Sequence, residues 1–291
     1  MTIVVTGATG HLGRLVVESL LAKGVAPEQI VAGGRSTDKL ADFATQGVNV
    51  VELDYTKPET LDAAFAGATQ LLLISASEPG KRFAQHSAVI DAAKKAGVAH
   101  LVYTSILAAD TTPHLIAPDH KASEEAIAAS GIPATILRNG WYTENYTQSA
   151  AQAVQTGEIV ASVGEGRVAS ASRKDYAEAA AAVLTNPELQ GKVYELSGDT
   201  AWTHDELAAA VSEIAGRPVV YRDVTPEEHG EILTGFGLDE GTVGFVVGLD
   251  QNTKAGLLDS TTGELAALIG HATTPLLVGL QEDLVAEPAA I

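Results

Sequence analysis

Three glycines near the start of the chain, Gly7, Gly10 and Gly13, have the spacing of a loop that binds a diphosphate. Gly7 permits a tight turn, Gly10 leaves room for a phosphate against the backbone, and Gly13 allows a helix to pack closely on a strand. A helix that starts here would offer unpaired N–H groups and a partial positive charge to the phosphates. The expected contacts are Gly7, Ala8, Thr9, Gly10, His11, Leu12 and Gly13. A glycine-rich turn that binds no ligand is the alternative interpretation.

Such a loop needs a strand before it and a helix after it, and the sequence provides both. Residues 2–5 are a β-branched run that predicts a buried strand, and residues 15–21 have helical apolar spacing. Further strands are predicted at residues 29–33, 49–53, 70–74, 100–104 and 134–138, with helices at 85–96 and 121–130. Strands that alternate with helices in this way predict an α/β fold, a Rossmann-type doubly wound parallel sheet.

The second predicted strand is followed by Arg35, at a position about 20 residues beyond the glycine loop. A site specific for NAD usually has Asp or Glu there, which accepts hydrogen bonds from the ribose hydroxyls. Arg35 cannot accept such bonds, but its guanidinium suits a 2′-phosphate, and Lys39 lies nearby in the sequence. We therefore expect NADPH rather than NADH as the cofactor. A surface arginine at the start of a helix is the alternative.

The carboxyl ends of the other strands supply further candidates, because these ends line the ligand crevice of a parallel sheet. Ser75 and the residues up to Pro79 are expected beside the nicotinamide ribose, with a solvent loop as the alternative. Asn139, a short polar residue after the sixth strand, suits the nicotinamide region, and a loop cap is the other interpretation. Trp141 and Tyr142 can stack on a flat substrate or cofactor, or they can pack where the chain leaves the sheet.

The G-x-x-G-x-x-G spacing resembles that of the extended and atypical short-chain dehydrogenases/reductases. In that superfamily an Asp at the place of Asp54 contacts the adenine edge, although Asp54 can equally cap a turn. The superfamily also carries a Tyr-x-x-x-Lys pair, whose tyrosine donates the proton. His120 and Glu124 stand at those two places, so alcohol dehydrogenase chemistry is not expected. His120 is a candidate proton donor or electrostatic partner, and a helix-terminal histidine paired with Asp119 or solvent is the alternative.

Several segments together resemble the NmrA-like branch of this superfamily, in particular its flavin-free type 2 NAD(P)H:quinone oxidoreductases and the sister triphenylmethane dye reductases. These segments are residues 7–10, Arg35, Ser77-Glu78, the pair His120 and Glu124, and residues 137–142. The NADP contacts that the resemblance implies are residues 7–12, Arg35, Ser77, Glu78, Pro79, Asn139, Gly140, Trp141, Tyr142, Thr143 and Glu144. The resemblance implies neither a flavin nor a metal.

The activity that the resemblance implies is direct hydride transfer from NADPH to a quinone or a similar conjugated acceptor. A quinone accepts hydride readily because the product is an aromatic phenolate, so positioning can supply much of the catalysis without a Tyr-Lys pair. His120 and Tyr142 are the catalytic candidates. Two other functions stay open: a nucleotide-sensing regulator without catalysis, and a reductase of triphenylmethane-type dyes.

The composition fits an ordinary globular protein of 291 residues, with 46% hydrophobic and 19% charged residues. A net charge of −19 argues against a nucleic-acid partner, because an acidic surface repels phosphates. The chain has no cysteine, which excludes disulfides and thiol catalysis. No apolar run reaches the roughly 18 residues of a membrane span, and a strand expected from residue 2 leaves no room for a signal peptide. We expect a cytoplasmic enzyme, and a homodimer is left open.

From about residue 147 the alternation gives way to short mixed elements. This change predicts an NAD(P)-binding domain at residues 1–146 and a smaller α/β substrate lobe at residues 147–291, with the chain free to cross back. Within the lobe, strands are predicted at residues 159–162 and 193–196 and helices at 174–184 and 204–215. The lobe is expected over the carboxyl ends of the sheet, with the substrate between the two. Phe236, Phe245, Val246 and Val247 can form an apolar lid or the lobe core, and the core is favoured.

Overall fold

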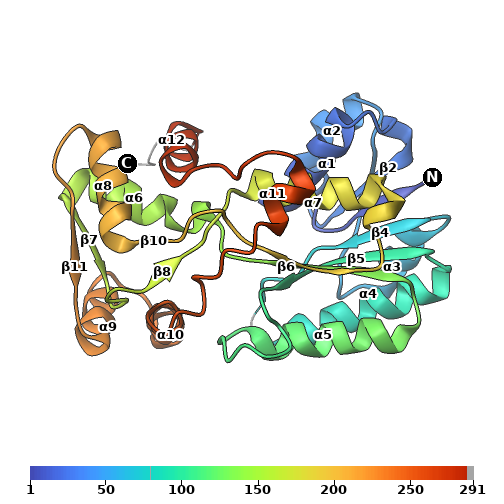
Figure 1. The fold of residues 1–291 in the computed structure, drawn as a ribbon. Helices are drawn as coiled ribbons and strands as arrows, with labels where there is room; N and C mark the ends of the chain where they lie inside the picture. The colour runs from blue at the N-terminus through green and yellow to red at the C-terminus, as the bar shows by residue number, and fades with distance from the viewer. Residues whose placement is uncertain (79, 287–291) are drawn as a thin grey trace.

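The computed structural model describes residues 1–78 and 80–286, and its centre is a seven-stranded parallel sheet (Figure 1). The strands are β1 (Ile3–Val5), β2 (Ile30–Gly34), β3 (Asn49–Glu52), β4 (Gln70–Leu73), β5 (His100–Ile106), β6 (Ala134–Asn139) and β9 (Val193–Leu196). Their order is β3-β2-β1-β4-β5-β6-β9, so the winding reverses between β1 and β4. The predicted doubly wound α/β sheet is confirmed. Pro79, an expected cofactor contact, lies outside the described residues.

Helices cover both faces of the sheet, because successive residues of a strand point to opposite faces. One face packs against α1 (His11–Ala22), α2 (Ala41–Thr45), α7 (Arg173–Thr185) and α11 (Glu264–Ile269). The other face packs against α3 (Pro58–Phe65), α4 (Arg82–Ala96) and α5 (Ala117–Ser130). On β1, Ile3 and Val5 belong to the first core and Val4 to the second, so this central strand is buried on both sides.

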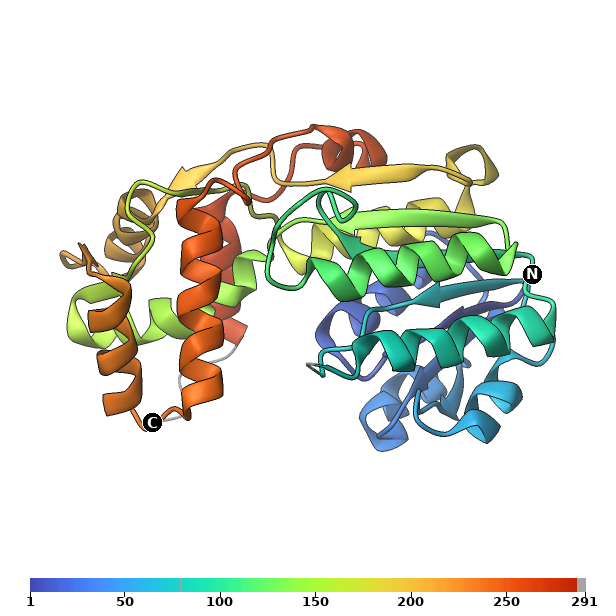
Figure 2. The same cartoon turned by 90° about the horizontal axis from the view of Figure 1, so that it is seen from below.

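A smaller lobe lies at the opposite end of the molecule from the N-terminus (Figure 1). Its helices are α6 (Thr147–Thr156), α8 (His204–Ala215), α9 (Pro226–Gly235), α10 (Glu240–Lys254) and α12 (Leu276–Ala286). Two small sheets join them: β7 (Glu158–Ala161) pairs in parallel with β11 (Val220–Asp223), and β8 (Arg167–Val168) pairs antiparallel with β10 (Trp202–Thr203). Figure 2 shows that the segments between lobe and sheet run along one edge of the molecule.

Elements that were expected in the lobe belong to the sheet instead. β9 extends the sheet beyond β6, with Val193 beside Ile136 and Leu196 beside Asn139. α7 packs against α1, and α11 packs against α7. The predicted strand at residues 193–196 and helix at 174–184 both form, but the chain crosses back, as the prediction allowed, and they lie with the large sheet rather than in the lobe. A short apolar run predicts a strand but does not identify the sheet that it joins.

The favoured interpretation of Phe236 and Phe245 as lobe core is also wrong. Phe236 is 64% exposed and Phe245 is 41% exposed, while Val246 and Val247 are half-buried. These residues lie on α9 and α10 or at their ends, and α10 buries Thr253 alone among its residues. The two helices pack mainly on each other, so much of their apolar surface has no core to enter.

The turn between β1 and α1 depends on two glycines. Gly7 has a φ of 61°, in the left-handed region that favours glycine. A Cβ atom on Gly13 would overlap the carbonyl oxygen of Gly7 and would lie 2.8 Å from the Cα of Ala8. The close packing predicted for Gly13 is therefore confirmed, and it brings the N-terminus of α1 to the carboxyl end of β1.

Gly13→Ala should destabilise the protein, because its methyl group would have to displace the backbone of the turn. We expect the free energy of unfolding to fall by about 3 kcal/mol, at the upper end of overpacking costs, in a urea titration. Gly244→Ala is the matched control, since Gly244 lies in α10 with open space at the Cβ position, and it should hold or gain stability. Equal stability of Gly13→Ala and the wild type would contradict the close contact.

Candidate active site

Two adjoining cavities open at the carboxyl ends of the parallel strands. The glycine-loop cavity has a volume of about 340 Å³ and lies over the turn between β1 and α1. The aromatic cavity has a volume of about 250 Å³ and is lined by residues of both the sheet and the lobe. Ser75, just after β4, lines both. The cavities therefore meet where the winding of the sheet reverses, which is the place where doubly wound sheets bind ligands.

Most residues expected on the phosphate side line the glycine-loop cavity. These are Gly7, Thr9, Gly10, Arg35, Lys39, Asp54, Ser75, Ser77 and Glu78. The other expected residues of the loop do not line it: Ala8, Leu12 and Gly13 are buried, and His11 is exposed on the first turn of α1. Gly10 is the N-cap of α1, and as a glycine it has no side chain that could cap the helix. The first N–H groups of α1 are therefore suited to bind an anion.

The rim of the glycine-loop cavity carries two basic side chains, Arg35 and Lys39. The Arg35 side chain is 68% exposed, and its Nη1 lies 3.3 Å from Glu78 Oε1. An ion pair this exposed holds its partners weakly, so Arg35 is able to turn toward a stronger anion. Asp54 caps a turn while it lines the cavity, because its Oδ1 accepts from Thr56 N at 2.9 Å and from Thr56 Oγ1 at 2.7 Å. These two hydrogen bonds lower the pKa of Asp54.

The aromatic cavity gathers side chains from several strand ends and from the lobe. The expected residues among them are Ser75, His120, Asn139, Gly140, Trp141 and Tyr142. Thr143 and Glu144, also expected as contacts, do not line it. The Thr143 Oγ1 lies 2.9 Å from Ser170 Oγ, and the Glu144 Oε1 accepts from Arg173 N at 2.7 Å. Residues 257–258, two leucines, line the cavity from the lobe side.

His120 is buried in the wall of the aromatic cavity and held by Tyr103. It is 2% exposed, and its Nδ1 lies 2.8 Å from Tyr103 Oη. Burial and the nearby charge of Arg82 lower the pKa of His120 to about 3, so its ring is neutral at pH 7. His120 does lie in the first turn of α5, as the alternative interpretation has it, but its pairing with Asp119 or solvent is wrong, because the residue is buried and its Nδ1 contacts Tyr103.

Tyr142 and Asn139 contact each other at the end of β6. The Tyr142 ring packs edge-on against Tyr176, with centroids 5.2 Å apart, and the Arg173 guanidinium lies 5.0 Å from its centre. The Asn139 Nδ2 donates to Tyr142 Oη at 3.4 Å, while the Asn139 Oδ1 is buried and has no partner among the described residues. A carboxamide N–H of a nicotinamide would satisfy that oxygen. The residues present therefore fit the expected cofactor.

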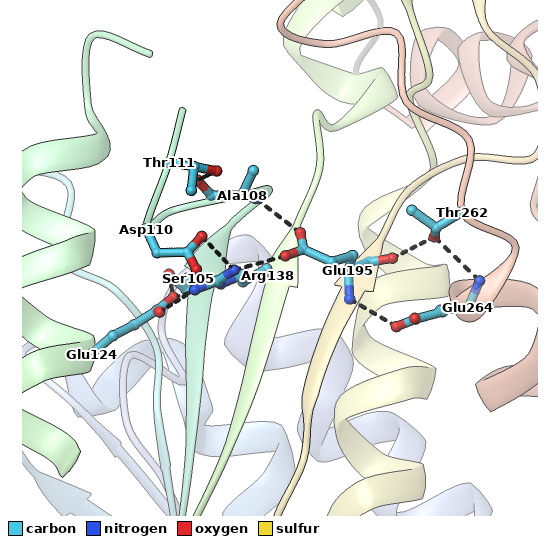
Figure 3. Close-up of polar contacts among 9 residues, drawn as sticks. All are labelled: Ser105, Ala108, Asp110, Thr111, Glu124, Arg138, Glu195, Thr262 and Glu264. Carbon is cyan, nitrogen blue, oxygen red and sulfur yellow. Dashed lines mark hydrogen bonds and ion pairs between the residues drawn. The ribbon is translucent and has the colours of Figure 1, made fainter. Parts of the chain in front are cut away.

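Glu124, at the place where the superfamily has lysine, is held in an ion-pair network around Arg138 (Figure 3). The Arg138 Nη2 lies 2.6 Å from Glu124 Oε2, and its Nη1 lies 2.9 Å from Asp110 Oδ1 and 2.8 Å from Glu195 Oε1. Ser105 Oγ donates to Glu124 Oε1 at 2.6 Å. Only 9% of the Arg138 side chain is exposed. Glu124 thus pairs a buried cation.

The Arg138 network also holds the loop that covers the aromatic cavity. The backbone N–H of Ala108, a residue with a φ of 48°, donates to Glu195 Oε2 at 2.8 Å (Figure 3). On its other side, Glu195 N donates to Glu264 Oε2 at 2.8 Å, and Thr262 Oγ1 donates to the Glu195 carbonyl. The network therefore joins the cavity loop, the edge strand and the segment that returns from the lobe.

The chain matches the NmrA-like family over residues 1–267. It belongs to this family. Quinone oxidoreductase 2 of Escherichia coli (strain K12) is 44% identical over 274 residues, which cover 94% of this chain and 96% of that protein. The NAD(P)H azoreductase of Xenophilus azovorans is 32% identical over 82% of each chain. The predicted resemblance to the NmrA-like quinone oxidoreductases is confirmed.

Two solved structures of NmrA-like relatives superpose on nearly the whole chain. The NADPH complex of the NADPH-dependent quinone oxidoreductase QOR2 from E. coli has a TM-score of 0.92 and 43% identity, over 97% of this chain and 99% of that one. Triphenylmethane reductase of Citrobacter sp., in complex with NADP(H), has a TM-score of 0.92 and 38% identity, over 97% and 100%.

Several residues of this NmrA-like site were not predicted from the sequence. Tyr55 lines the glycine-loop cavity, and Arg82, His114 and Arg173 line the aromatic cavity. Tyr55 follows a predicted strand end directly, so its position was a usable signal. The other three come from loops and helix starts whose course the sequence does not give.

No helix in the described part of the chain combines the length and hydrophobicity that a membrane crossing needs.

Arg138→Met should destabilise the protein strongly, because it leaves three carboxylates around a buried site without their cation. We expect a loss of about 3–5 kcal/mol in the free energy of unfolding, measured by chemical denaturation. Arg222→Met is the matched control: Arg222 pairs with Glu158 and Glu228 at the surface, so its loss should cost about 1 kcal/mol or less. Equal effects of the two substitutions would contradict the central place of Arg138.

Proposed function

We propose that this protein is an NADPH-dependent oxidoreductase that reduces a quinone or a similar conjugated acceptor by direct hydride transfer, without a flavin. The observation that carries the proposal is the meeting of the two cavities at Ser75. One of them has a basic rim and a helix N-terminus for phosphates, and the other has aromatic walls for flat rings. The cytoplasm is the proposed place of the activity.

The side chains that would hold NADPH come from both cavities. Arg35 and Lys39 are placed for the 2′-phosphate, and the glycine loop is placed for the diphosphate. The buried Asn139 Oδ1 is placed for the carboxamide of the nicotinamide. NADPH, when bound, supplies the hydride. The solved relatives described as complexes with NADPH and NADP(H) support this assignment.

The aromatic cavity suits an acceptor that is flat and that gains negative charge only as it reacts. Trp141 and Tyr142 offer ring surfaces, and Leu257 and Leu258 limit the access of water from the lobe side. His120 offers a neutral ring in place of a charge. A ketone would need a stronger acid at this position, whereas a quinone does not, because its product anion is an aromatic phenolate.

A dye reductase is the second candidate function, favoured by the similarity to triphenylmethane reductase and to an azoreductase. Such acceptors are also flat and conjugated, and a triarylmethyl cation needs a hydride alone. The same cavity would serve either substrate class, so the choice between them depends on measured rates.

The proposal predicts that purified protein without flavin absorbance oxidises NADPH when 1,4-benzoquinone is added, followed by the loss of the reduced nicotinamide absorbance. Crystal violet in place of the quinone tests the dye reductase. Binding of NADPH without turnover of any acceptor would favour a nucleotide-sensing regulator. A bound flavin in active protein would contradict direct transfer.

Arg35→Asp should weaken NADPH more than NADH, because it replaces a partner of the 2′-phosphate by a repelling charge. We expect the KM for NADPH to rise roughly 10- to 100-fold, as for the loss of a hydrogen bond to a charged group, and the KM for NADH to change less than about threefold. Arg217→Asp, a surface change in the lobe where Arg217 bonds the Val154 carbonyl, is the control for net charge. Equal losses for both nucleotides would remove Arg35 from the 2′-phosphate site.

A further inference from the structure

A row of buried polar groups lies behind the aromatic cavity and ends at His120. The Ala76 N–H donates to His86 Nε2 at 2.8 Å. The His86 Nδ1 lies 2.8 Å from Ser123 Oγ and 3.4 Å from Tyr103 Oη. Tyr103 Oη in turn lies 2.8 Å from His120 Nδ1. The row joins the loop after β4 to α4, β5 and α5. The proposed function gives no role to His86, Ser123 or Tyr103.

A backbone amide at the start of this row, the Ala76 N–H, determines which atom is the donor in each of its hydrogen bonds. An amide N–H can donate but not accept, so His86 Nε2 must be the ring nitrogen without a hydrogen. Burial and the charge of Arg82 lower the pKa of His86 to about 3, so the ring is neutral and carries one proton. That proton is therefore on Nδ1 of His86.

The next two hydroxyls follow from the position of that proton. His86 Nδ1–H donates to Ser123 Oγ, and the Ser123 hydroxyl donates to the Asp119 carbonyl at 2.7 Å. Tyr103 cannot donate to His86 Nδ1, which already carries a hydrogen. Ser123 also interacts with the Tyr103 hydroxyl, but its own hydroxyl is already engaged with His86 and the Asp119 carbonyl. His120 Nδ1, at 2.8 Å, is the closest acceptor of the Tyr103 hydroxyl among the described residues. Tyr103 is fully buried, so a hydroxyl without an acceptor would be costly.

We infer that Tyr103 and His86 are positioning residues that fix His120 as the Nε2–H tautomer. This N–H, which has no partner among residues 1–78 and 80–286, is then the donor that His120 offers in the wall of the aromatic cavity. Because Nδ1 is taken by Tyr103, Nε2 is the ring nitrogen left for a molecule in that cavity. Its use as a donor to an acceptor oxygen rests on the proposed function.

The charges around the row favour a neutral His120. Arg82 lies against it from α4, with its Nε donating to the Ala76 carbonyl at 2.7 Å and its Nη1 near Asp119. His114, on the loop after β5, is a further neighbour that disfavours a second proton, and Glu124 is paired with Arg138. His120 therefore stays neutral and acts through a hydrogen bond.

The N–H of His120 would stabilise the negative charge that develops on the acceptor oxygen. Hydride addition brings two electrons and one hydrogen to the quinone, which becomes the hydroquinone monoanion, while NADPH becomes NADP⁺. The monoanion then takes its proton from water. His120 keeps its own proton throughout, so nothing has to reload it between turnovers.

The tautomer can be read directly by nitrogen NMR of protein labelled with ¹⁵N-histidine, with NADP⁺ added. The His120 signals, assigned by their loss in His120→Gln, should show an Nε2 that carries hydrogen and an Nδ1 that does not. Tyr103→Phe should move both signals toward a mixture of tautomers. The opposite tautomer in the wild type, or unchanged signals in Tyr103→Phe, would overturn the inference.

Turnover gives a second readout. With benzoquinone, Tyr103→Phe should lower kcat about 10-fold, as for the loss of part of one preorganised donor, with the KM for NADPH changed less than twofold. His120→Gln, which retains an N–H donor, should keep more activity than His120→Ala. Tyr194→Phe is the matched control, because it removes a tyrosine hydroxyl that bonds the Leu189 carbonyl far from the cavity.

The experiments distinguish failure of the positioning inference from failure of the proposed function. If the wild-type signals show the Nε2–H tautomer but no acceptor is reduced, the proposed function is wrong and the positioning row stands. If a quinone is reduced while His120 has its proton on Nδ1, or while Tyr103→Phe and Tyr194→Phe have equal kcat, the positioning row is wrong and the proposed function stands.

Discussion

The burial of one cation, Arg138, is the constraint on which the rest of the site depends. A guanidinium removed from water has to be paired, and a buried pair is stable when every partner is in place. Arg138 therefore holds together Glu124 of α5, Asp110 of the loop after β5 and Glu195 of β9. Glu195 lies 57 residues beyond Arg138 in the sequence, on the far side of the first lobe segment. The meeting of the three residues fixes the edge of the sheet and, through Glu195, the loop over the aromatic cavity.

Two electrostatic environments adjoin at Ser75. The glycine-loop cavity has exposed basic side chains and suits a ligand that is charged before it arrives. Two histidines in the wall of the aromatic cavity, His114 and His120, are neutral, since burial lowers their pKa values to about 4 and about 3. Fixed dipoles in such a place need no reorganisation when charge appears on a bound ring. The contrast between the two cavities suits the proposed reaction, because NADPH is an anion from the start and the acceptor becomes an anion only when it receives the hydride.

The parts of this fold that follow from local pattern were predictable, and those that follow from long-range pairing were not. Residues 2–13 carry a strand, a turn and a helix start in one continuous stretch, so the position of the glycine loop at a strand end was predictable. The position of Arg35 beside the same cavity was predictable from its spacing to that loop. β9 was assigned to the lobe because its four residues do not show that β6 is its neighbour. The burial of His120 depends on Tyr103 and His86, which lie on other elements and whose approach no local pattern records. Phe236 and Phe245 are exposed despite their residue type, because hydrophobic character predicts burial only on average.

The course of the chain has a consequence for how such a protein can diversify. After the first lobe segment the chain supplies α7 and β9 to the sheet, and after a second segment it supplies α11. A recombination event at any one point near the lobe would therefore separate strands and helices from the layer that they complete. Because of this interleaving, the lobe cannot be exchanged as one continuous segment of the chain. Replacement of individual side chains leaves this frame intact, and the solved relatives described as a quinone oxidoreductase and a triphenylmethane reductase superpose on 97% of this chain.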